Sequence, residues 1–257
     1  MLDSSRFNPT GRFAGLADLY ARYRPSYPDA ALDRVVTFAG LTATSLLVDV
    51  GAGTGISSRL FARRGVPVLG IEPNNEMRRK AEAEPLSDEL PRPQYRAGKA
   101  EATGLADGCA DAVLSAQAFH WFDADAALRE FHRILKPSGV VALMWNERAE
   151  SDAFTAAFGD VVRTAPEAAA VEGPRARAGE PLLLCPLFHD AVREPFAGEQ
   201  VLDEEGVLGR AFSASYAPRE PAAIEIFTRA LRDVFAAFQR DGAVTLRYET
   251  TLYLARA

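Results

Sequence analysis

The stretch LLVDVGAGTGISSRLFARRGVPVLGIEPN, Leu46 to Asn74, decides the fold of this chain. It opens with a short run of branched apolar residues, Leu46–Val50, which is typical of a buried strand. Glycines follow this run at once, and a second apolar run, Val66–Ile71, comes after a helical segment. A tight glycine turn between a strand and a helix brings backbone N–H groups against a ligand. The stretch therefore predicts an α/β fold that binds a ligand at this turn.

The spacing of the glycines restricts the kind of ligand. Gly51, Gly53 and Gly55 form a G-x-G-x-G pattern, and Ile56 stands where the dinucleotide fingerprint G-x-G-x-x-G has its third glycine. Asp49 precedes the first glycine by two residues, and its carboxylate would repel a pyrophosphate. A cationic ligand suits this turn better than a dinucleotide.

A second acidic residue, Glu72, stands at the tip of the second apolar run. A carboxylate in this position accepts hydrogen bonds from a ribose diol in nucleoside-binding folds. Together with the glycine turn, it predicts a nucleoside-containing ligand.

Further strands and helices alternate along the next part of the chain. Ala112–Ala116 and Val140–Trp145 have the composition of buried strands, and Gln94–Ala97 is a weaker candidate. Asp123 is a good N-cap for a helix that we expect to stop at Lys136, because KPSG follows. This alternation predicts a parallel sheet with helices on both faces.

The pattern changes after Trp145. A helix is expected over residues 151–165, and the stretch 166–181, rich in Pro, Gly, Ala and Arg, is expected to be a mobile loop. A strand near Ala191–Phe196 and a helix ending at Gly242 precede a final alternating strand, from Val244 to Leu254. We interpret residues 1–257 as one domain, with an N-terminal cap over 1–28 and a helical and loop insertion over 150–240.

Composition limits the class of function. The 257 residues are 48% hydrophobic and carry a formal net charge of −6, which argues against nucleic-acid binding. We expect neither a signal peptide nor a membrane span, and hence a cytoplasmic protein. Cys109 and Cys185 stand far apart without metal-ligand spacing, so we expect two small buried hydrophobes and no metal site.

The motifs taken together resemble a known family. VDVGAGTGISSRLFARRG followed by VLGIEPN is similar to the first two motifs of class I S-adenosylmethionine-dependent methyltransferases. The similarity continues through AGKAEATGLADGCADAVLSAQAFHWFD and RILKPSGVVALMWN, and so covers roughly Ala30 to Asn146. YARYRPSYP and LGRAFSASY resemble the small-molecule members of type 11, near the trans-aconitate methyltransferases. The resemblance implies a Rossmann-like, doubly wound, mostly parallel seven-stranded sheet with an antiparallel C-terminal strand and a helical insertion near the C-terminus.

The resemblance also implies a cofactor, S-adenosylmethionine, and residues that bind it. These are Asp49, Gly51, Ala52, Gly53, Gly55, Glu72, Pro73, Met77, Ala100, Glu101, Gln117 and Ala118. Many relatives carry Asp at the position of Lys99, where it accepts from the adenine amino group. A lysine cannot accept, so that amino group must find Glu101, a backbone carbonyl or water.

The methyl acceptor is expected to be a small molecule. His120 is the candidate base for a hydroxyl or carbon acid, whereas a carboxylate acceptor would need no base. The residues expected to line the acceptor pocket are Tyr20, Arg24, Trp121, Trp145 and Tyr216. Arg24 or Arg148 is expected to bind an acidic acceptor, unless it forms a surface ion pair. Residues 1–27 and 210–218 are expected to close over the cleft.

Two other functions stay open at this point. One is a non-catalytic protein that binds a nucleoside cofactor with the same fold, and the other is a nicotinamide-dependent oxidoreductase, which Ile56 disfavours. We expect no nucleic-acid or membrane partner, and either a monomer or a weak homodimer.

Overall fold

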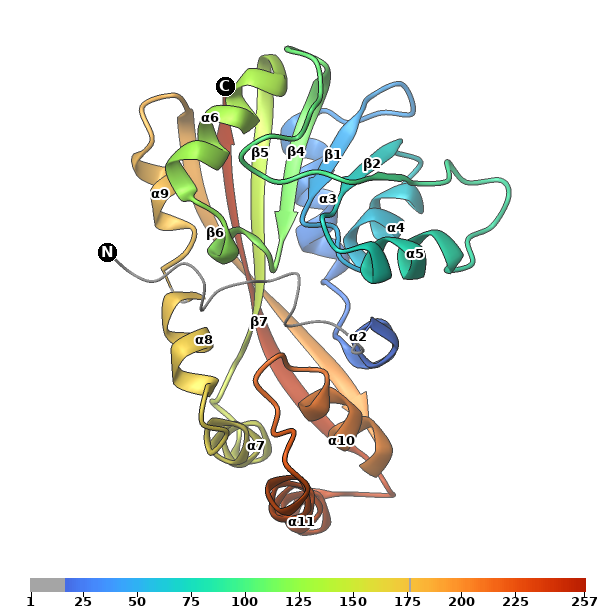
Figure 1. Cartoon of the computed structure of the whole chain (residues 1–257), viewed down its shortest axis with the longest axis vertical. Helices are drawn as coiled ribbons and strands as arrows, with labels where there is room; N and C mark the ends of the chain where they lie inside the picture. The colour runs from blue at the N-terminus through green and yellow to red at the C-terminus, as the bar shows by residue number, and fades with distance from the viewer. Residues whose placement is uncertain (1–16, 176) are drawn as a thin grey trace.

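The computed structural model describes residues 17–175 and 177–257, and these form one seven-stranded sheet with helices packed against it (Figure 1). The strands are β1 Leu47–Val50, β2 Val68–Ile71, β3 Gln94–Arg96, β4 Ala110–Ala116, β5 Leu135–Arg148, β6 His189–Leu202 and β7 Val244–Arg256. They lie in the order β3-β2-β1-β4-β5-β7-β6. Only β7 runs antiparallel to its neighbours, β5 and β6. The expected mostly parallel sheet with an antiparallel C-terminal strand is confirmed.

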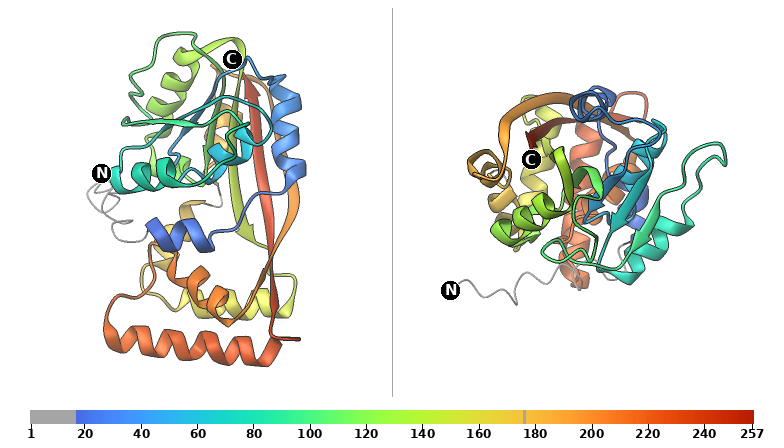
Figure 2. Two further views of the ribbon diagram at one scale, coloured as in Figure 1. Left: turned by 90° about the vertical axis from the view of Figure 1, so that its right-hand side faces the viewer. Right: turned by 90° about the horizontal axis from the view of Figure 1, so that it is seen from above.

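Helices cover both faces of the sheet (Figure 2). They are α2 Ala17–Tyr23, α3 Asp29–Ala39, α4 Ile56–Ala62, α5 Asn75–Ala83, α6 Ala124–Ile134, α7 Ala153–Arg163, α8 Ala168–Arg175, α9 Glu180–Leu184, α10 Glu204–Phe212 and α11 Pro221–Phe238, with a 3-10 helix, η2 Phe119–Trp121. The side chain of Asp123 accepts from the backbone N–H of Ala126 and so caps α6 as expected.

Alternation along each central strand divides the core between the two faces of the sheet. In β5, Val141 and Leu143 join a cluster with Phe131 of α6, while Val140 and Ala142 join a cluster on the other face. That second cluster contains residues of α3 and α4. Because successive side chains of a strand point to opposite faces, a continuous apolar run serves both layers. This arrangement explains why the buried strands appear in the sequence as short continuous runs of apolar residues.

The three longest strands extend beyond the rest of the sheet. β5 and β6 have 14 residues each and β7 has 13, whereas β1 and β2 have four. Figure 1 shows them continuing downward to a second group of helices, α7, α10 and α11. A third apolar cluster fills this lower lobe and includes Phe158, Leu231 and Leu246. The span 150–240, expected as a helical and loop insertion, thus also contributes β6 to the sheet.

Several boundaries differ from the expectation. Residues 166–181 are not a continuous loop: α8 begins at Ala168, where three alanines favour a helix and Ala168 itself is fully buried. α6 ends at Ile134 rather than Lys136, and β5 already begins at Leu135. Ser138 takes φ 64° within KPSG, so the chain turns inside the strand.

Two smaller expectations also need correction. α11 ends at Phe238 instead of continuing to Gly242, since residues 240 and 243 already form an isolated bridge. Cys109 and Cys185 are partly exposed free thiols that pack at the edge of the core, and are not fully buried.

Helix α2 connects the lower lobe to the rest of the sheet and its helices, which we call the upper lobe. Its Asp18 pairs with Lys80 of α5 at 3.0 Å, and Arg22 pairs with Glu205 of α10 at 2.9 Å. The Tyr23 hydroxyl donates to the same Glu205 carboxylate at 2.6 Å. The rest of the expected N-terminal cap, residues 1–16, lies outside the described residues.

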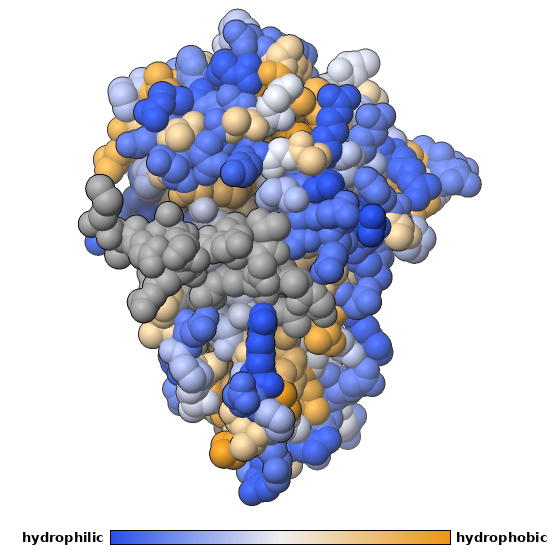
Figure 3. Space-filling view, viewed as in Figure 1, coloured by the Kyte–Doolittle hydropathy of each residue, from blue (hydrophilic) through white to orange (hydrophobic). Residues whose placement is uncertain are grey.

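The surface is largely hydrophilic on the face shown in Figure 3, with apolar side chains in separate patches. The most exposed large apolar residues are Leu184, Val201 and Ile226, which lie on three different elements. Single exposed apolar residues are normal for a folded protein. Among the helices of the described ranges, none is long and apolar enough to cross a membrane.

Candidate active site

The glycine turn after β1 forms the floor of the site. Gly51, Gly53 and Gly55 have φ of 76°, 56° and 74°, a region that favours glycine. A Cβ at Gly51 would come within 2.5 Å of the Ala118 side chain, so that position needs glycine for packing. A Cβ at Gly53 would meet no protein atom within 4 Å. The turn therefore presents open backbone at Gly53.

Asp49 lies in β1 beneath this turn and is fully buried. Its Oδ2 accepts from the hydroxyls of Ser57 and Ser58, each at 2.6 Å, while Oδ1 is buried and has no hydrogen-bond partner among the described residues. Burial raises the pKa of this carboxyl group, and the two hydroxyls oppose the rise. A buried acceptor atom with no partner costs free energy, so one oxygen of Asp49 is available to a donor.

Glu72 follows β2 and fixes the position of the turn. Its Oε2 accepts from the Gly53 N–H at 2.9 Å, and its Oε1 accepts from the Asn74 N–H at 2.8 Å. Burial raises the pKa of Glu72, and these two backbone bonds lower it. Each carboxylate oxygen can accept a second hydrogen bond, so a diol can still bind here.

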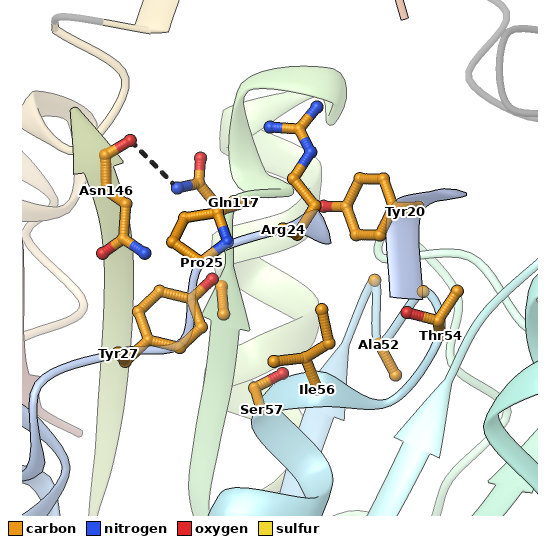
Figure 4. Close-up of a pocket in the computed structure, with 13 residues that line it drawn as sticks. Tyr20, Arg24, Pro25, Tyr27, Ala52, Thr54, Ile56, Ser57, Gln117 and Asn146 are labelled. Atoms are coloured by element: carbon orange, nitrogen blue, oxygen red, sulfur yellow. Dashed lines mark hydrogen bonds between the residues drawn. The ribbon is translucent and has the colours of Figure 1, made fainter. Parts of the chain in front are cut away.

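Two adjoining cavities open around the turn. The first, which we call the loop cavity, is shown in Figure 4 and is lined by Tyr20, Arg24, Pro25, Tyr27, Gly51, Ala52, Gly53, Thr54, Ile56, Ser57, Ala116, Gln117 and Asn146. The second, the outer cavity, is lined by Tyr20, Gly51, Gly53, Glu72, Pro73, Asn74, Met77, Ala116, Gln117, Ala118, Trp121 and Phe122. Sequence-predicted residues from four separate segments thus meet in one cleft.

Other predicted cofactor residues lie outside these two cavities. Ala100 is buried, and the Glu101 carboxylate accepts from the Asp123 N–H at 3.0 Å, at the start of α6. Gly55 is packed against Tyr95, since a Cβ there would come within 2.2 Å of the Tyr95 hydroxyl. Their roles in binding a cofactor stay predictions.

Gln117 lies at the centre of the site, where β4 ends. Its φ of 58° is uncommon for a residue other than glycine, and such backbone strain gathers at functional sites. Its Nε2 donates to the Asn146 carbonyl at 3.1 Å, and its Oε1 accepts from Arg175 at 3.1 Å. The amide is therefore held in one orientation between the two cavities.

The surroundings of His120 bear on its expected role. Trp145 Nε1 donates to His120 Nδ1 at 3.3 Å, which places the proton of the neutral imidazole on Nε2. Burial lowers the pKa of His120 well below its usual value, and the nearby Arg175 and Arg24 lower it further. The imidazole is neutral at physiological pH and presents an N–H donor.

Three residues expected near the acceptor have partners within the protein, and their roles towards an acceptor stay predictions. Trp145 is 2% exposed and packs edge-on against Tyr253 in the core, and its Nε1–H donates to His120. Tyr216 donates to Glu172 at 2.6 Å. Arg148 also binds Glu172, at 2.8 Å, and is thus held in an ion pair.

Sequence reasoning missed several residues of the site. Phe122 lines the outer cavity and Asn146 the loop cavity, and both directly adjoin segments that the motifs had identified. Arg175 contacts Gln117 from α8, which lies within the stretch expected to be a loop. No local signal could have identified it, because its partner is 58 residues away in the sequence.

Comparisons with known proteins agree with this geometry. Residues 48–143 match the family model described as "Methyltransferase domain". An uncharacterised methyltransferase of Mycobacterium tuberculosis is 35% identical over 158 residues, which are 62% of this chain and 61% of that protein. A malonyl-[acyl-carrier protein] O-methyltransferase of Pectobacterium atrosepticum is 32% identical over 133 residues, 51% of this chain and 49% of that protein.

The fold comparison covers more of the chain. A solved structure from Anaeromyxobacter dehalogenans, provisionally named a type II methyltransferase, superposes with a TM-score of 0.63 at 24% identity. The match covers 91% of this chain and 97% of that one. In sequence, the chain spans 61% of the length of the mycobacterial relative. Residues 48–143 therefore match a methyltransferase domain in sequence, and the chain shares its fold with a solved structure named as a methyltransferase.

Proposed function

We propose that this protein transfers a methyl group from S-adenosylmethionine to a small-molecule acceptor. The observation that carries the proposal is the pair of buried carboxylates around an open glycine turn: Asp49 with an unpartnered oxygen, and Glu72 locked to Gly53. S-adenosylmethionine would supply an activated methyl group on its sulfonium.

The residues of the two cavities fit the parts of this cofactor. Gly51 to Gly53 and Asp49 would lie by the methionine moiety, and Glu72 would accept from the ribose hydroxyls. Pro73 and Met77, in the outer cavity, would pack on the adenine or the ribose. Gln117 and Ala118 would line the floor near the sulfonium.

Arg24 complements this arrangement at the loop cavity. It stacks on Tyr20, with its guanidinium carbon 4.7 Å from the ring centroid, and donates to the Ser213 carbonyl at 3.1 Å. Its Nε is buried without a partner. Because Arg24 shares the cavity with the glycine turn, we assign it to the carboxylate of the methionine moiety, in place of an acidic acceptor.

Positioning is the main task of the protein in such a transfer. The site needs to align the acceptor with the methyl group and to exclude water, and alignment alone supplies a large part of the acceleration. Helix α2 lies where it can do this, since it joins both lobes and brings Tyr20 to both cavities. The relatives leave the acceptor open, because one is named for a malonyl-[acyl-carrier protein] and another carries no acceptor in its name.

A calorimetric titration tests the proposed function. We expect the protein to bind S-adenosylhomocysteine and not to bind NAD, because Ile56 occupies the position where a dinucleotide needs a third glycine. Incubation with S-adenosylmethionine and a metabolite library should then yield S-adenosylhomocysteine. Tight binding of NAD instead would support an oxidoreductase. Cofactor binding without turnover of any acceptor would support a non-catalytic protein.

A further inference from the structure

A polar cavity of about 190 Å³ lies at the end of β5, beside the loop cavity. Asn146 lines both cavities, so they are neighbours across one side chain. Four guanidinium groups line the polar cavity, from Arg148, Arg163, Arg175 and Arg210. The carboxylates in its lining number three. Asp160, outside the lining, pairs with Arg163 at 2.7 Å and adds a fourth carboxylate beside these arginines.

Two of the arginines are neutralised within the protein. Arg148 binds the Glu172 carboxylate at 2.8 Å, and Arg163 pairs with Glu150 at 2.5 Å. The third carboxylate of the lining is that of Glu147. It forms no ion pair with an arginine in the part of the chain that the structure describes.

The other two arginines hydrogen-bond only to neutral groups within the described residues, although Arg175 lies close enough to Glu172 to lower the pKa of that carboxyl group. Arg175 donates to the Asn146 carbonyl at 3.0 Å and to the Gln117 amide oxygen at 3.1 Å. Arg210, which is 7% exposed, donates to the Tyr248 hydroxyl at 2.9 Å. Among residues 17–175 and 177–257, neither has a carboxylate within ion-pair distance. In addition, Arg175 Nε is buried with no hydrogen-bond partner.

Like charges thus gather beside the methyl-transfer site. Burial lowers the pKa of Arg24, and the nearby positive charges of Arg210 and Arg175 lower it further, to about 10. Buried guanidinium groups without a counterion cost free energy, and each has five N–H donors to satisfy. An anionic ligand would supply both the charge and the acceptors, and a planar carboxylate matches the guanidinium fork.

We propose that the methyl acceptor is a small molecule with a carboxylate, which Arg175 and Arg210 bind in the polar cavity. This inference rests on the proposed function. Because the carboxylates of Glu147, Glu150 and Glu172 lie around the same cavity, a monoanion fits it better than a phosphate dianion. Arg175 contacts Gln117, which lines both cofactor cavities, so a carboxylate held there keeps the acceptor beside the site of transfer. Arg175 and Arg210 thereby set the specificity of the reaction.

Binding to the protein saturated with S-adenosylhomocysteine tests this proposal. The probes are benzoate and hexanoate, each titrated beside its primary amide, with inorganic phosphate as a further anion. We expect at least one acid to bind, its amide to bind at least tenfold more weakly, and phosphate to bind no more tightly than the amide. Arg175→Gln should weaken binding of the acid at least tenfold while leaving the affinity for S-adenosylhomocysteine within about twofold.

Two further variants control the experiment. Arg175→Lys keeps the charge but loses the fork, so its affinity for the acid should lie between those of the wild type and Arg175→Gln. Arg229→Gln removes an exposed arginine of α11 and should change nothing. The proposal is overturned if no acid binds, if acids and amides bind equally, if phosphate binds as tightly as the acids, or if Arg175→Gln retains wild-type affinity for the acid. Failure of S-adenosylhomocysteine itself to bind would instead reject the proposed function.

Discussion

The two sides of the cleft are built in opposite ways. The cofactor side consists of β1, the glycine turn and Glu72, and its charges are carboxylates that hydrogen-bond to neighbours within 20 residues. The acceptor side consists of Arg175 and Arg210, whose hydrogen-bond partners lie as far as 58 residues away. Its charges are guanidinium groups that, within residues 17–175 and 177–257, hydrogen-bond to neutral partners. A local motif thus forms one side, and the long-range fold assembles the other.

The largest expected effect concerns the stability of the lower lobe. Leu231 is fully buried in the lower-lobe cluster, so Leu231→Ala should lower the free energy of unfolding by about 2–5 kcal/mol. Denaturant titration measures this change. Ile226→Ala, on the same helix but 70% exposed, should change stability by no more than about 0.5 kcal/mol. Equal effects of the two substitutions would mean that α11 does not pack as described.

Three buried carboxylates of the upper lobe have pKa values that are shifted in different directions. The pKa values of Asp49 and Glu72 are raised, whereas hydrogen bonds from Arg133, chiefly, and from Thr103 lower that of Glu130 to about 2. A lowered pKa in the folded state stabilises the protein above the unfolded value, and this stability is lost as pH falls from about 5 towards 2. Glu130→Gln should remove up to about 3 kcal/mol at pH 7 and flatten the acid limb of stability against pH. An unchanged acid limb would contradict the structural role of Glu130.

The glycine turn offers a matched pair of substitutions. Gly53 and Gly104 both have positive φ, and a Cβ at either would meet no protein atom within 4 Å. Gly53→Ala and Gly104→Ala should therefore cost similar stability, about 1–2 kcal/mol. Only Gly53→Ala should weaken binding of S-adenosylhomocysteine, by about a hundredfold, because only Gly53 lines the cavities. Wild-type affinity in Gly53→Ala would remove the turn from the cofactor site.

The smallest expected effect concerns His120. Since Nδ1 accepts from Trp145, the imidazole can donate through Nε2 but has no free lone pair with which to act as a base. His120→Ala should then lower kcat about tenfold, the size of one neutral hydrogen bond. A loss of a hundredfold or more would indicate general-base catalysis.

The sequence alone predicts much of the cofactor side, because the determinants are consecutive. Asp49, the glycines and Glu72 sit at the ends of two neighbouring parallel strands, so their order along the chain already brings them together. Gln117 and Ala118 follow for the same reason, at the end of β4. Met77 and Trp121 line the outer cavity, and their roles towards cofactor and acceptor stay predictions.

The acceptor side could not be predicted in the same way. Arg175 lies in a stretch rich in Pro, Gly and Ala, whose helix is stabilised by packing of Ala168 in the lower lobe. Arg148 and Arg175 look alike in the sequence, yet of the two only Arg148 forms an ion pair with Glu172 within the described residues. Which arginines are left without a counterion depends on contacts between α8, α10 and the strand ends, and local patterns do not encode such contacts.

Calorimetric titration of S-adenosylhomocysteine into two variants tests most directly whether the cleft has a cofactor side and an acceptor side. Glu72→Ala should lose roughly 1–3 kcal/mol of binding free energy, because hydrogen bonds to a charged group are removed. Arg175→Gln should bind S-adenosylhomocysteine as the wild type does. An unimpaired Glu72→Ala variant, or an equal loss in both variants, would contradict the division of the site.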